Sequence, residues 1–107
     1  MAEDWLLCRA CRARVTRPDD AIEQGGAHAY SFVNPHGLVF EIGCFARAPG
    51  CRTLEAPTLD WTWFPGWAWQ PAACAGCGAH LGWRYRRGAE VFYGLILARL
   101  QAAPPPA

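Results

Sequence analysis

The alternation of apolar and polar residues predicts short strands joined by tight turns. In the segment AYSFVNPHGLVFEIGCF, the run Tyr30 to Val33 leads into Asn34-Pro35-His36-Gly37, which has the composition of a turn. Apolar residues then recur at every second position, namely Leu38, Phe40, Ile42 and Cys44. Because residues two apart share a strand face, we predict a β-hairpin here, with these four side chains on one face.

Three later segments also have the features of strands. TLDWTWF (58–64) predicts a short strand that ends at Pro65-Gly66. AHLGWRYRR (79–87) predicts a strand with two different faces, made of Leu81, Trp83 and Tyr85 and of Arg84 and Arg86, respectively. AEVFYGLILARL (89–100) is ambiguous by pattern, but its β-branched and aromatic residues and its internal Gly94 favour a final strand. The predicted fold class is mostly β.

Length and composition indicate one small globular domain. We place it at residues 1–100 of the 107-residue chain and expect the tail QAAPPPA (101–107) to be disordered. Glycine and proline, at 11 and 9 residues, favour short strands and tight turns over long helices. The net charge of +1 provides no basic field, which argues against nucleic-acid binding.

The N-terminal segment bears on the cellular compartment. MAEDWLLCRACRARV is acidic before a short apolar patch, the reverse of a secretory signal. No segment approaches the roughly 18 consecutive apolar residues of a membrane span. We therefore expect a cytoplasmic, reducing location, where metal binding or catalysis is a better default for cysteines than disulfides.

Two C-x-x-C pairs stand near opposite ends of the chain, Cys8 with Cys11 and Cys74 with Cys77. Two such knuckles match the ligand set of one tetrahedral, structural zinc ion. With 62 residues between Cys11 and Cys74, the metal would join both ends of the domain. A redox dithiol and two disulfides are the alternatives.

Cys44 and Cys51 do not form a knuckle. Cys44 continues the apolar face of a predicted strand, where a buried cysteine acts as a small hydrophobic residue. Cys51 follows Pro49-Gly50 and can be exposed. A catalytic role for either thiol needs a nearby base, which the sequence does not place beside it.

Tryptophan is concentrated in DWTWFPGWAW (60–69), which holds four of the six in the chain. On a strand, Trp61 and Trp63 would share a face, and Trp83 and Tyr85 repeat this spacing after the second knuckle. Such rings form either an aromatic core or the walls of a box. Polar residues alternate with the rings, which favours a box that binds a cation or a flat ring.

Four motifs occur here in the order found in the thalidomide-binding domain of the cereblon family. They are NPHG at 34–37, W-F-P-G-x-A-W at 63–69, C-x-x-C at 74–77 and H-[IL]-G-W-x-[FY] at 80–85. From the Cys8 knuckle to Leu100, the chain resembles this domain. It looks most like the stand-alone bacterial versions, often called CULT domains, which lack the regions that join the eukaryotic protein to a ubiquitin ligase.

The resemblance implies a fold and a ligand. The fold is two antiparallel sheets pinned by a four-cysteine zinc site, shared with the Yippee and methionine sulfoxide reductase B families. The ligand is a cyclic imide such as glutarimide, held in a cage of Trp63, Trp69 and Trp83 that is closed by Tyr85. Thalidomide-like drugs, uracil-like rings and protein C-termini that carry a cyclised Gln or Asn share this imide edge.

The resemblance also implies how the rest of the site is used. Backbone groups of Trp61, Thr62 and Trp63 would pair with the imide, and Asn34, Pro35 and Phe40 would form the rim. Trp61 replaces a histidine of the eukaryotic family, so a side-chain contact from this position is not implied. Trp67 is expected to pack rather than to bind.

Two other functions compete with a binding module for imides. A sulfoxide-reductase-like enzyme would use Cys44 or Cys51 as its reactive thiol. A methylammonium reader would use the aromatic cage together with an acidic residue at the rim, for which Asp60 is the candidate.

Overall fold

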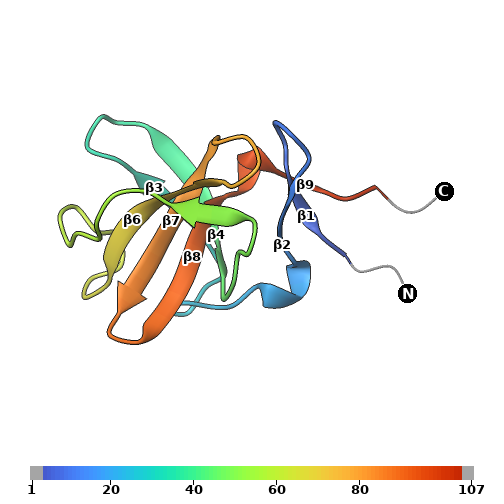
Figure 1. The fold of residues 1–107 in the computed structure, drawn as a ribbon. Helices are drawn as coiled ribbons and strands as arrows, with labels where there is room; N and C mark the ends of the chain where they lie inside the picture. The colour runs from blue at the N-terminus through green and yellow to red at the C-terminus, as the bar shows by residue number, and fades with distance from the viewer. Residues whose placement is uncertain (1–3, 105–107) are drawn as a thin grey trace.

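The computed structural model describes residues 4–104, which form two antiparallel sheets (Figure 1). The smaller sheet has the strand order β2-β1-β9 and consists of β1 (Leu6–Cys8), β2 (Arg14–Thr16) and β9 (Leu100–Ala102). The larger sheet has the order β3-β4-β8-β7-β6-β5 and consists of β3 (Ala29–Val33), β4 (Val39–Phe45), β5 (Cys51–Thr53), β6 (Ala68–Cys74), β7 (His80–Arg87) and β8 (Glu90–Ile96). Two 3₁₀ turns are η1 (Pro18–Asp20) and η2 (Leu97–Arg99). The predicted class, mostly β with two antiparallel sheets, is confirmed.

The larger sheet carries a hydrophobic cluster on each face. The inter-sheet core joins it to the smaller sheet and consists of Cys8, Val15, Phe45, Ala48, Cys74, Leu81, Leu95 and Leu100. The aromatic core consists of Ile42, Cys44, Phe64, Trp67, Tyr85, Phe92 and Ile96. Successive strand residues point to opposite faces, so Cys44 and Phe45 on β4 enter different cores. Phe64 and Trp67 come from the loop between β5 and β6, which therefore covers the aromatic face.

The predicted hairpin is present as β3 and β4. The Asn34 side-chain oxygen accepts the N–H groups of His36 (3.0 Å) and Leu38 (2.9 Å), which fixes the turn. Phe40, Ile42 and Cys44 pack on one face as expected. Leu38 does not join them, because it precedes β4 and is 58% exposed.

The prediction of a strand at 58–64 is wrong. Only Thr58 makes a bridge, to Trp69, and the chain then forms a turn in which Thr62 N–H donates to Leu59 C=O (3.3 Å). Side-chain hydroxyls take backbone partners here: Thr58 Oγ1 accepts Asp60 N–H, and Thr62 Oγ1 donates to Trp67 C=O. Such local bonds compete with a strand ladder, which the alternating pattern cannot reveal. Trp61 and Trp63 therefore do not share a strand face.

A bulge interrupts the alternation of β7. Gly82 pairs with Ala72 and His80 pairs with Ala73, which leaves Leu81 without a partner on β6. Leu81 consequently packs in the inter-sheet core instead of sharing a face with Tyr85, contrary to the prediction. Glycine is required at position 82, because a Cβ there would lie 2.2 Å from the Gly94 carbonyl oxygen.

The C-terminal segment is divided between the two sheets. The predicted final strand is β8, but it ends at Ile96, and η2 leads the chain into β9 of the smaller sheet. Gln101 and Ala102 belong to β9, and Ala103 N–H donates to Trp5 C=O (3.0 Å). The domain therefore extends beyond residue 100, because β1 offers an edge for pairing. The expected disorder of 105–107 concerns residues outside those described.

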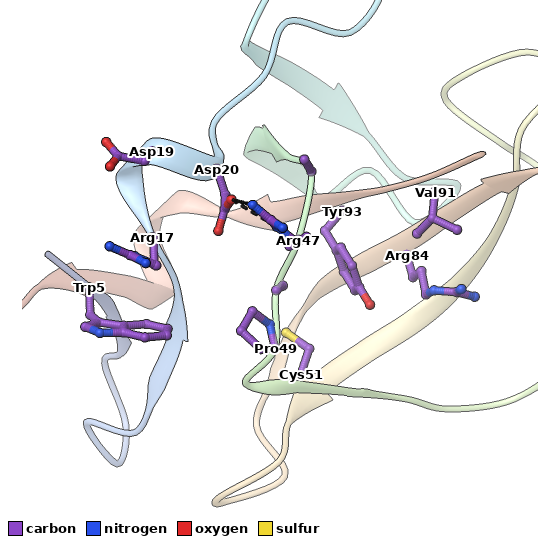
Figure 2. Close-up of a pocket in the computed structure, with 12 residues that line it drawn as sticks. Trp5, Arg17, Asp19, Asp20, Arg47, Pro49, Cys51, Arg84, Val91 and Tyr93 are labelled. Atoms are coloured by element: carbon purple, nitrogen blue, oxygen red, sulfur yellow. Dashed lines mark hydrogen bonds and ion pairs between the residues drawn. The ribbon is translucent and has the colours of Figure 1, made fainter. Parts of the chain in front are cut away.

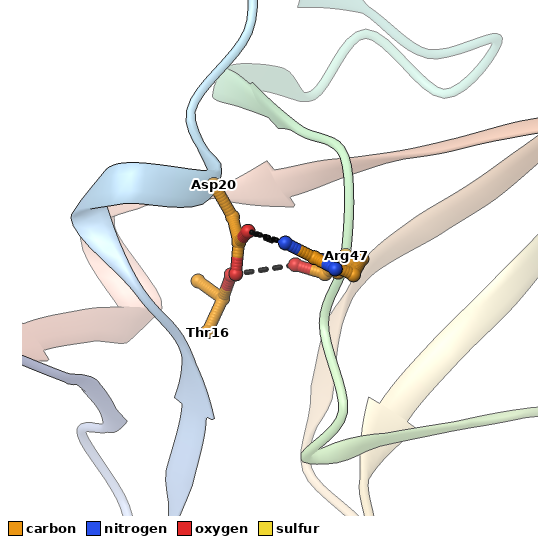
Figure 3. A network of polar contacts seen from close by, with 3 residues as sticks. All are labelled: Thr16, Asp20 and Arg47. Atoms are coloured by element: carbon orange, nitrogen blue, oxygen red, sulfur yellow. Dashed lines mark hydrogen bonds and ion pairs between the residues drawn. The ribbon is translucent and has the colours of Figure 1, made fainter.

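A polar network joins the two sheets at a second place (Figure 3). The Thr16 hydroxyl, fully buried at the end of β2, donates to Arg47 C=O (2.6 Å). The Arg47 guanidinium forms an ion pair with Asp20 (3.0 Å), whose own C=O accepts Ala46 N–H (2.8 Å). These bonds hold the segment after β2 against the segment after β4.

Within residues 4–104, no helix combines the length and apolar character needed to cross a membrane.

Candidate functional site

Four cysteines from opposite ends of the chain meet where the two sheets join. The Sγ atoms of Cys8, Cys11, Cys74 and Cys77 all lie within 4.8 Å of one another. Cys8 ends β1 and Cys74 ends β6, and both are buried, whereas Cys11 and Cys77 are exposed. The structure thus brings together the four cysteines that the sequence predicts as metal ligands.

The two knuckles have the same backbone geometry. In each, the N–H four positions after the first cysteine donates to the C=O of that cysteine: Arg12 to Cys8 (2.7 Å) and Gly78 to Cys74 (2.8 Å). This residue has a positive φ in both knuckles, +67° at Arg12 and +80° at Gly78. Each turn aims two further backbone N–H groups at the sulfur of its first cysteine, which stabilises a thiolate.

The four thiols of the group are electrostatically coupled. The N–H of Ala13 acts to lower the pKa of Cys11, but burial and the neighbouring thiols raise it to about 12, and burial also raises the pKa of Cys8. Burial acts to raise the pKa of the Cys74 thiol, but the N–H groups of Cys77 and Gly76 and the thiols of Cys11 and Cys8 outweigh it and bring the pKa to about 7. Tetrahedral zinc with Zn–S bonds of ~2.3 Å places its sulfurs about 3.8 Å apart. The Cys11–Cys74 and Cys8–Cys77 sulfur distances of 3.6 and 3.8 Å match this spacing. The four-cysteine group therefore fits one metal ion.

An aromatic pocket of about 750 Å³ opens on the side of the aromatic core. It is lined by eight of the nine residues that the sequence predicts to bind a ligand: Asn34, Pro35, Phe40, Trp61, Trp63, Trp69, Trp83 and Tyr85. Thr62 is the exception, because its hydroxyl donates to the C=O groups of Trp67 (2.7 Å) and Phe64 (3.3 Å). Its side chain holds the loop in place.

The indole N–H groups of two pocket tryptophans are hydrogen-bonded to backbone carbonyls. Trp63 Nε1 donates to Val33 C=O (3.2 Å), and Trp69 Nε1 donates to Asp60 C=O (2.6 Å). The rings of Trp63 and Trp83 stand nearly perpendicular, with centroids 4.9 Å apart and an angle of 76°. With their N–H groups satisfied, Trp63 and Trp69 offer the pocket mainly carbon surface and π faces.

Tyr85 lies deepest among these residues. It is 2% exposed and stacks on Phe92, with centroids 4.9 Å apart and an angle of 13°. Burial, with a further contribution from the nearby Cys44 thiol, raises the pKa of the Tyr85 hydroxyl, so it stays protonated at neutral pH. Trp67 packs in the aromatic core, as expected.

The backbone beside the pocket walls has free hydrogen-bonding groups. Within residues 4–104, no hydrogen bond uses the backbone N–H or C=O of Trp61 or Trp63. The loop conformation that replaced the predicted strand leaves these groups without a ladder partner. They are available to pair with a ligand.

The sequence did not identify six further residues that line the pocket: His36, Leu54, Pro71, Ala73, Gly78 and His80. His80 contacts Trp83 edge to face (5.0 Å, 87°), and its Nε2 is bonded to Gly82 C=O (2.9 Å). Burial lowers the pKa of His80, and the charge of Arg99 lowers it further, so the ring is neutral at neutral pH. His80 is the first residue of the H-[IL]-G-W motif, and this motif is the sequence signal that could have identified it as a pocket residue. Leu54 reaches the pocket through its pairing with Pro71, which no local pattern shows.

Cys44 and Cys51 lie outside the aromatic pocket. Cys44 is fully buried, as predicted, and burial raises its pKa to about 11. Burial, with the nearby Cys74 and Cys8 sulfurs, raises the pKa of the half-buried Cys51 to about 12. Protonated thiols are weak nucleophiles, so the buried Cys44, with its raised pKa, gives no support to the enzyme hypothesis.

A second cavity, of about 890 Å³, lies on the opposite face of the larger sheet (Figure 2). Arg84 and Tyr93, which are paired across β7 and β8, line it together with charged residues of both signs. Arg47 forms an ion pair with Asp20 there (3.0 Å), and Arg84 donates to the neutral Gln70 Oε1 (2.9 Å). The aromatic pocket is the better candidate for a ligand site, because it gathers eight of the nine residues that the sequence predicts to bind a ligand.

Comparison with known proteins agrees with the resemblance seen in the motifs. No protein-family model matches the chain. Protein cereblon of Gallus gallus is 33% identical over 110 residues, which cover 95% of this chain and 24% of that protein. Protein cereblon of Danio rerio is 38% identical over 83 residues (75% of this chain, 19% of that protein), and that of Xenopus tropicalis is 35% identical over 80 residues (70% and 18%).

These matches establish homology to cereblon over most of the chain. The chain spans about a fifth to a quarter of the length of these curated relatives. All three are animal proteins, so the likeness to bacterial single-domain versions stays a prediction.

Proposed function

Because this chain is homologous to cereblon over most of its length, we propose that it is a binding module that holds a cyclic imide in the aromatic pocket. Glutarimide, thalidomide-like compounds, uracil-like rings and C-terminal cyclic imides of proteins share the required C(=O)–NH–C(=O) edge. Zinc at the four cysteines is structural in this proposal, and the chain performs no chemistry on its ligand.

The free backbone edge beside the aromatic walls carries this proposal. Trp61 and Trp63 leave N–H and C=O groups unpaired within residues 4–104, next to Trp69 and Trp83. A cyclic imide needs both aromatic faces and free backbone groups, because its methylene groups pack on π faces while its polar edge needs hydrogen bonds. A buried polar group left without a partner costs about 1–3 kcal/mol, so pairing at this edge decides whether the ring is bound.

The pocket lining favours a neutral ring over an ammonium ion. Among the described residues, no Asp or Glu lines the pocket. Asp60, the proposed acidic partner of a methylammonium group, takes part through its backbone C=O, which accepts Trp69 Nε1–H. A cation in this pocket would therefore interact with the π faces but would have no acidic side chain to balance its charge.

The size of an imide is sufficient for useful affinity. A ring of about eight heavy atoms could gain up to ~12 kcal/mol at the upper bound of ~1.5 kcal/mol per atom. Micromolar binding requires about 8 kcal/mol. A pocket of this size can thus bind the bare ring.

Isothermal titration calorimetry with three probes tests the proposal. We expect glutarimide to bind, and N-methylglutarimide to bind at least ~10-fold more weakly, because methylation removes the donor that the backbone would pair. Tetramethylammonium should not bind measurably. Equal affinity for the two imides would refute pairing at the imide edge, and preferential binding of tetramethylammonium would favour the methylammonium reader.

A further inference from the structure

A buried glutamine anchors the loop that carries two of the pocket tryptophans. The loop between β5 and β6 (54–67) contributes Trp61 and Trp63 to the aromatic pocket. Gln70 of β6 is 7% exposed, and its Nε2 donates to the C=O of Glu55 at the start of this loop (2.9 Å). Gln70 therefore joins the pocket loop to β6 through a side-chain hydrogen bond.

Glu55 marks the corner at which the chain leaves the ladder with β6. Leu54 N–H still donates to Pro71 C=O (2.9 Å), but Glu55 has a φ of +63°, in the left-handed region. This conformation is unfavourable for a residue with a Cβ. The direction of the Glu55 C=O depends on it, so the bond from Gln70 stabilises the corner.

Arg84 determines which way the Gln70 amide points. The two residues are paired across β6 and β7, and Arg84 Nη1 donates to Gln70 Oε1 (2.9 Å). A guanidinium can only donate, so the amide oxygen has to face Arg84 and the amide NH₂ has to face Glu55. Within residues 4–104, Arg84 makes no ion pair that would compete with this bond.

The Gln70–Arg84 pair lies on the other side of the sheet from the aromatic pocket. Trp69 and Pro71, the neighbours of Gln70 in β6, line that pocket, and successive strand residues point to opposite faces. Arg84 lines the second cavity (Figure 2). Neither member of the pair lines the aromatic pocket, so the pair can act on a ligand there only through the loop.

We propose that Gln70, oriented by Arg84, is a positioning residue of the imide site, which fixes the corner at Glu55 and so holds Trp61 and Trp63 in their places. This inference rests on the proposed function, since it concerns the loop whose backbone pairs with the imide. Without the bond to Glu55, fewer molecules present the loop in its binding-competent arrangement, and the apparent affinity falls with that fraction.

Gln70→Glu separates positioning from overall stability. A carboxylate has nearly the same size and still accepts from Arg84, but it has no N–H to donate to Glu55. Because the new ion pair offsets the lost bond, we expect a Tm within about 2 °C of the wild type. Calorimetry should show glutarimide binding weakened by at least ~5-fold, equivalent to about 1 kcal/mol.

Hydrogen exchange gives a readout that needs no ligand. The indole N–H of Trp69 is bonded to Asp60 C=O across the pocket (2.6 Å), so its exchange rate, measured by NMR, reports how firmly the loop is closed on the cage. In Gln70→Glu this exchange should be at least ~5-fold faster.

A wild-type exchange rate in Gln70→Glu overturns the inference, and so does wild-type affinity. A Tm lower by about 4 °C or more would show that Gln70 serves the stability of the whole fold, which also overturns it. If glutarimide does not bind the wild-type chain, the proposed function fails, and the exchange rate alone decides whether Gln70 positions the loop.

Variants of Arg84 test the other half of the pair. Arg84→Met has no donor and should weaken glutarimide binding, whereas Arg84→Lys keeps a donor and should bind more tightly than Arg84→Met. Arg86→Met is the matched control, because Arg86 is exposed on the same strand face and donates to Gly88 C=O (3.2 Å). This variant should keep the wild-type affinity. Equal losses in Arg84→Met and Arg86→Met would assign the effect to the charge of β7 and overturn the inference.

Discussion

The tryptophans at 61, 63, 67 and 69 have different environments, and the environment of each decides what it does. Trp67 is 5% exposed, packs on Phe92 (4.9 Å) and has the Arg87 guanidinium 4.5 Å from its ring centroid, so it is a core residue. The indole N–H groups of Trp63 and Trp69 donate to backbone carbonyls, and both rings line the pocket. Sequence spacing alone could not separate these roles.

For the individual residues, we predict that each cage tryptophan is required for imide binding. Trp63→Ala, Trp69→Ala and Trp83→Ala should each weaken glutarimide binding by about 30-fold or more, because loss of a packed aromatic wall costs about 2–4 kcal/mol. Calorimetry measures the affinities, and circular dichroism checks that each variant is folded.

Trp5→Phe is the control for these variants, because Trp5 lines the other cavity. Cys44→Ala and Cys51→Ala should also keep the wild-type affinity, since neither thiol lines the aromatic pocket. Wild-type affinity in a folded Trp83→Ala variant would contradict the cage.

Among the elements, the β6–β7 hairpin connects the metal site to the pocket. Trp69 pairs directly with Tyr85, and Pro71 pairs with Trp83, so these four pocket residues lie opposite one another on two neighbouring strands. The same hairpin carries Cys74 and Cys77 at its turn. The cage is thus built on an element that the cysteine group fixes at one end.

The elements also show how far the sequence could predict the molecule. Alternation and turn residues identified the β3–β4 hairpin and β7, because along most of these strands apolar side chains of the aromatic face alternate with polar or exposed ones. They could not reveal the loop at 59–67, where Thr58 and Thr62 replace ladder bonds with side-chain bonds. They also could not reveal β9, because its three residues are defined by their pairing with β1 and not by a pattern of their own.

Gly50 lies between β2 of the smaller sheet and the end of β6 in the larger one, and we predict that Gly50→Ala destabilises the protein. Gly50 N–H donates to Val15 C=O (3.0 Å), its C=O accepts Ala75 N–H (2.8 Å), and a Cβ would lie 1.9 Å from Arg14 C=O. The smaller sheet would have to move away, which typically costs about 1–3 kcal/mol. Thermal unfolding should show a Tm lower by about 4 °C or more.

Pro49→Ala is the neighbouring control and should change the Tm much less, because Pro49 is exposed. An unchanged Tm in Gly50→Ala would mean that the two sheets are not held in close contact at this point.

On the scale of the whole molecule, the cysteine group joins segments that are distant in the chain. Cys8 and Cys74 end strands of different sheets, so a metal ion on these sulfurs closes a loop that includes most of the domain. The motif spacing predicted this group correctly, because C-x-x-C knuckles are determined by local sequence. Cys8 and Cys74 also belong to the inter-sheet core.

We predict one zinc ion per chain and a fold that depends on it. Elemental analysis should give a zinc-to-protein ratio near one, and a chelator should abolish the β-sheet signal in circular dichroism, because metal binding and folding are coupled in small domains. Cys74→Ser should unfold in the same way, whereas Cys51→Ser should keep the metal. A folded, metal-free protein with four reactive thiols would contradict this.

The pairing of β1 with β9 has a practical consequence. Trp5 and Ala103 are hydrogen-bonded neighbours, and Figure 1 shows both ends of the described chain leaving the molecule at the smaller sheet, while the β3–β4 turn lies at the other end. A tag, bead or fused protein can therefore be attached at either terminus on the side away from the pocket. The same geometry suits insertion into a surface loop of a host protein, which would make a portable element for detecting whatever ligand the aromatic pocket binds.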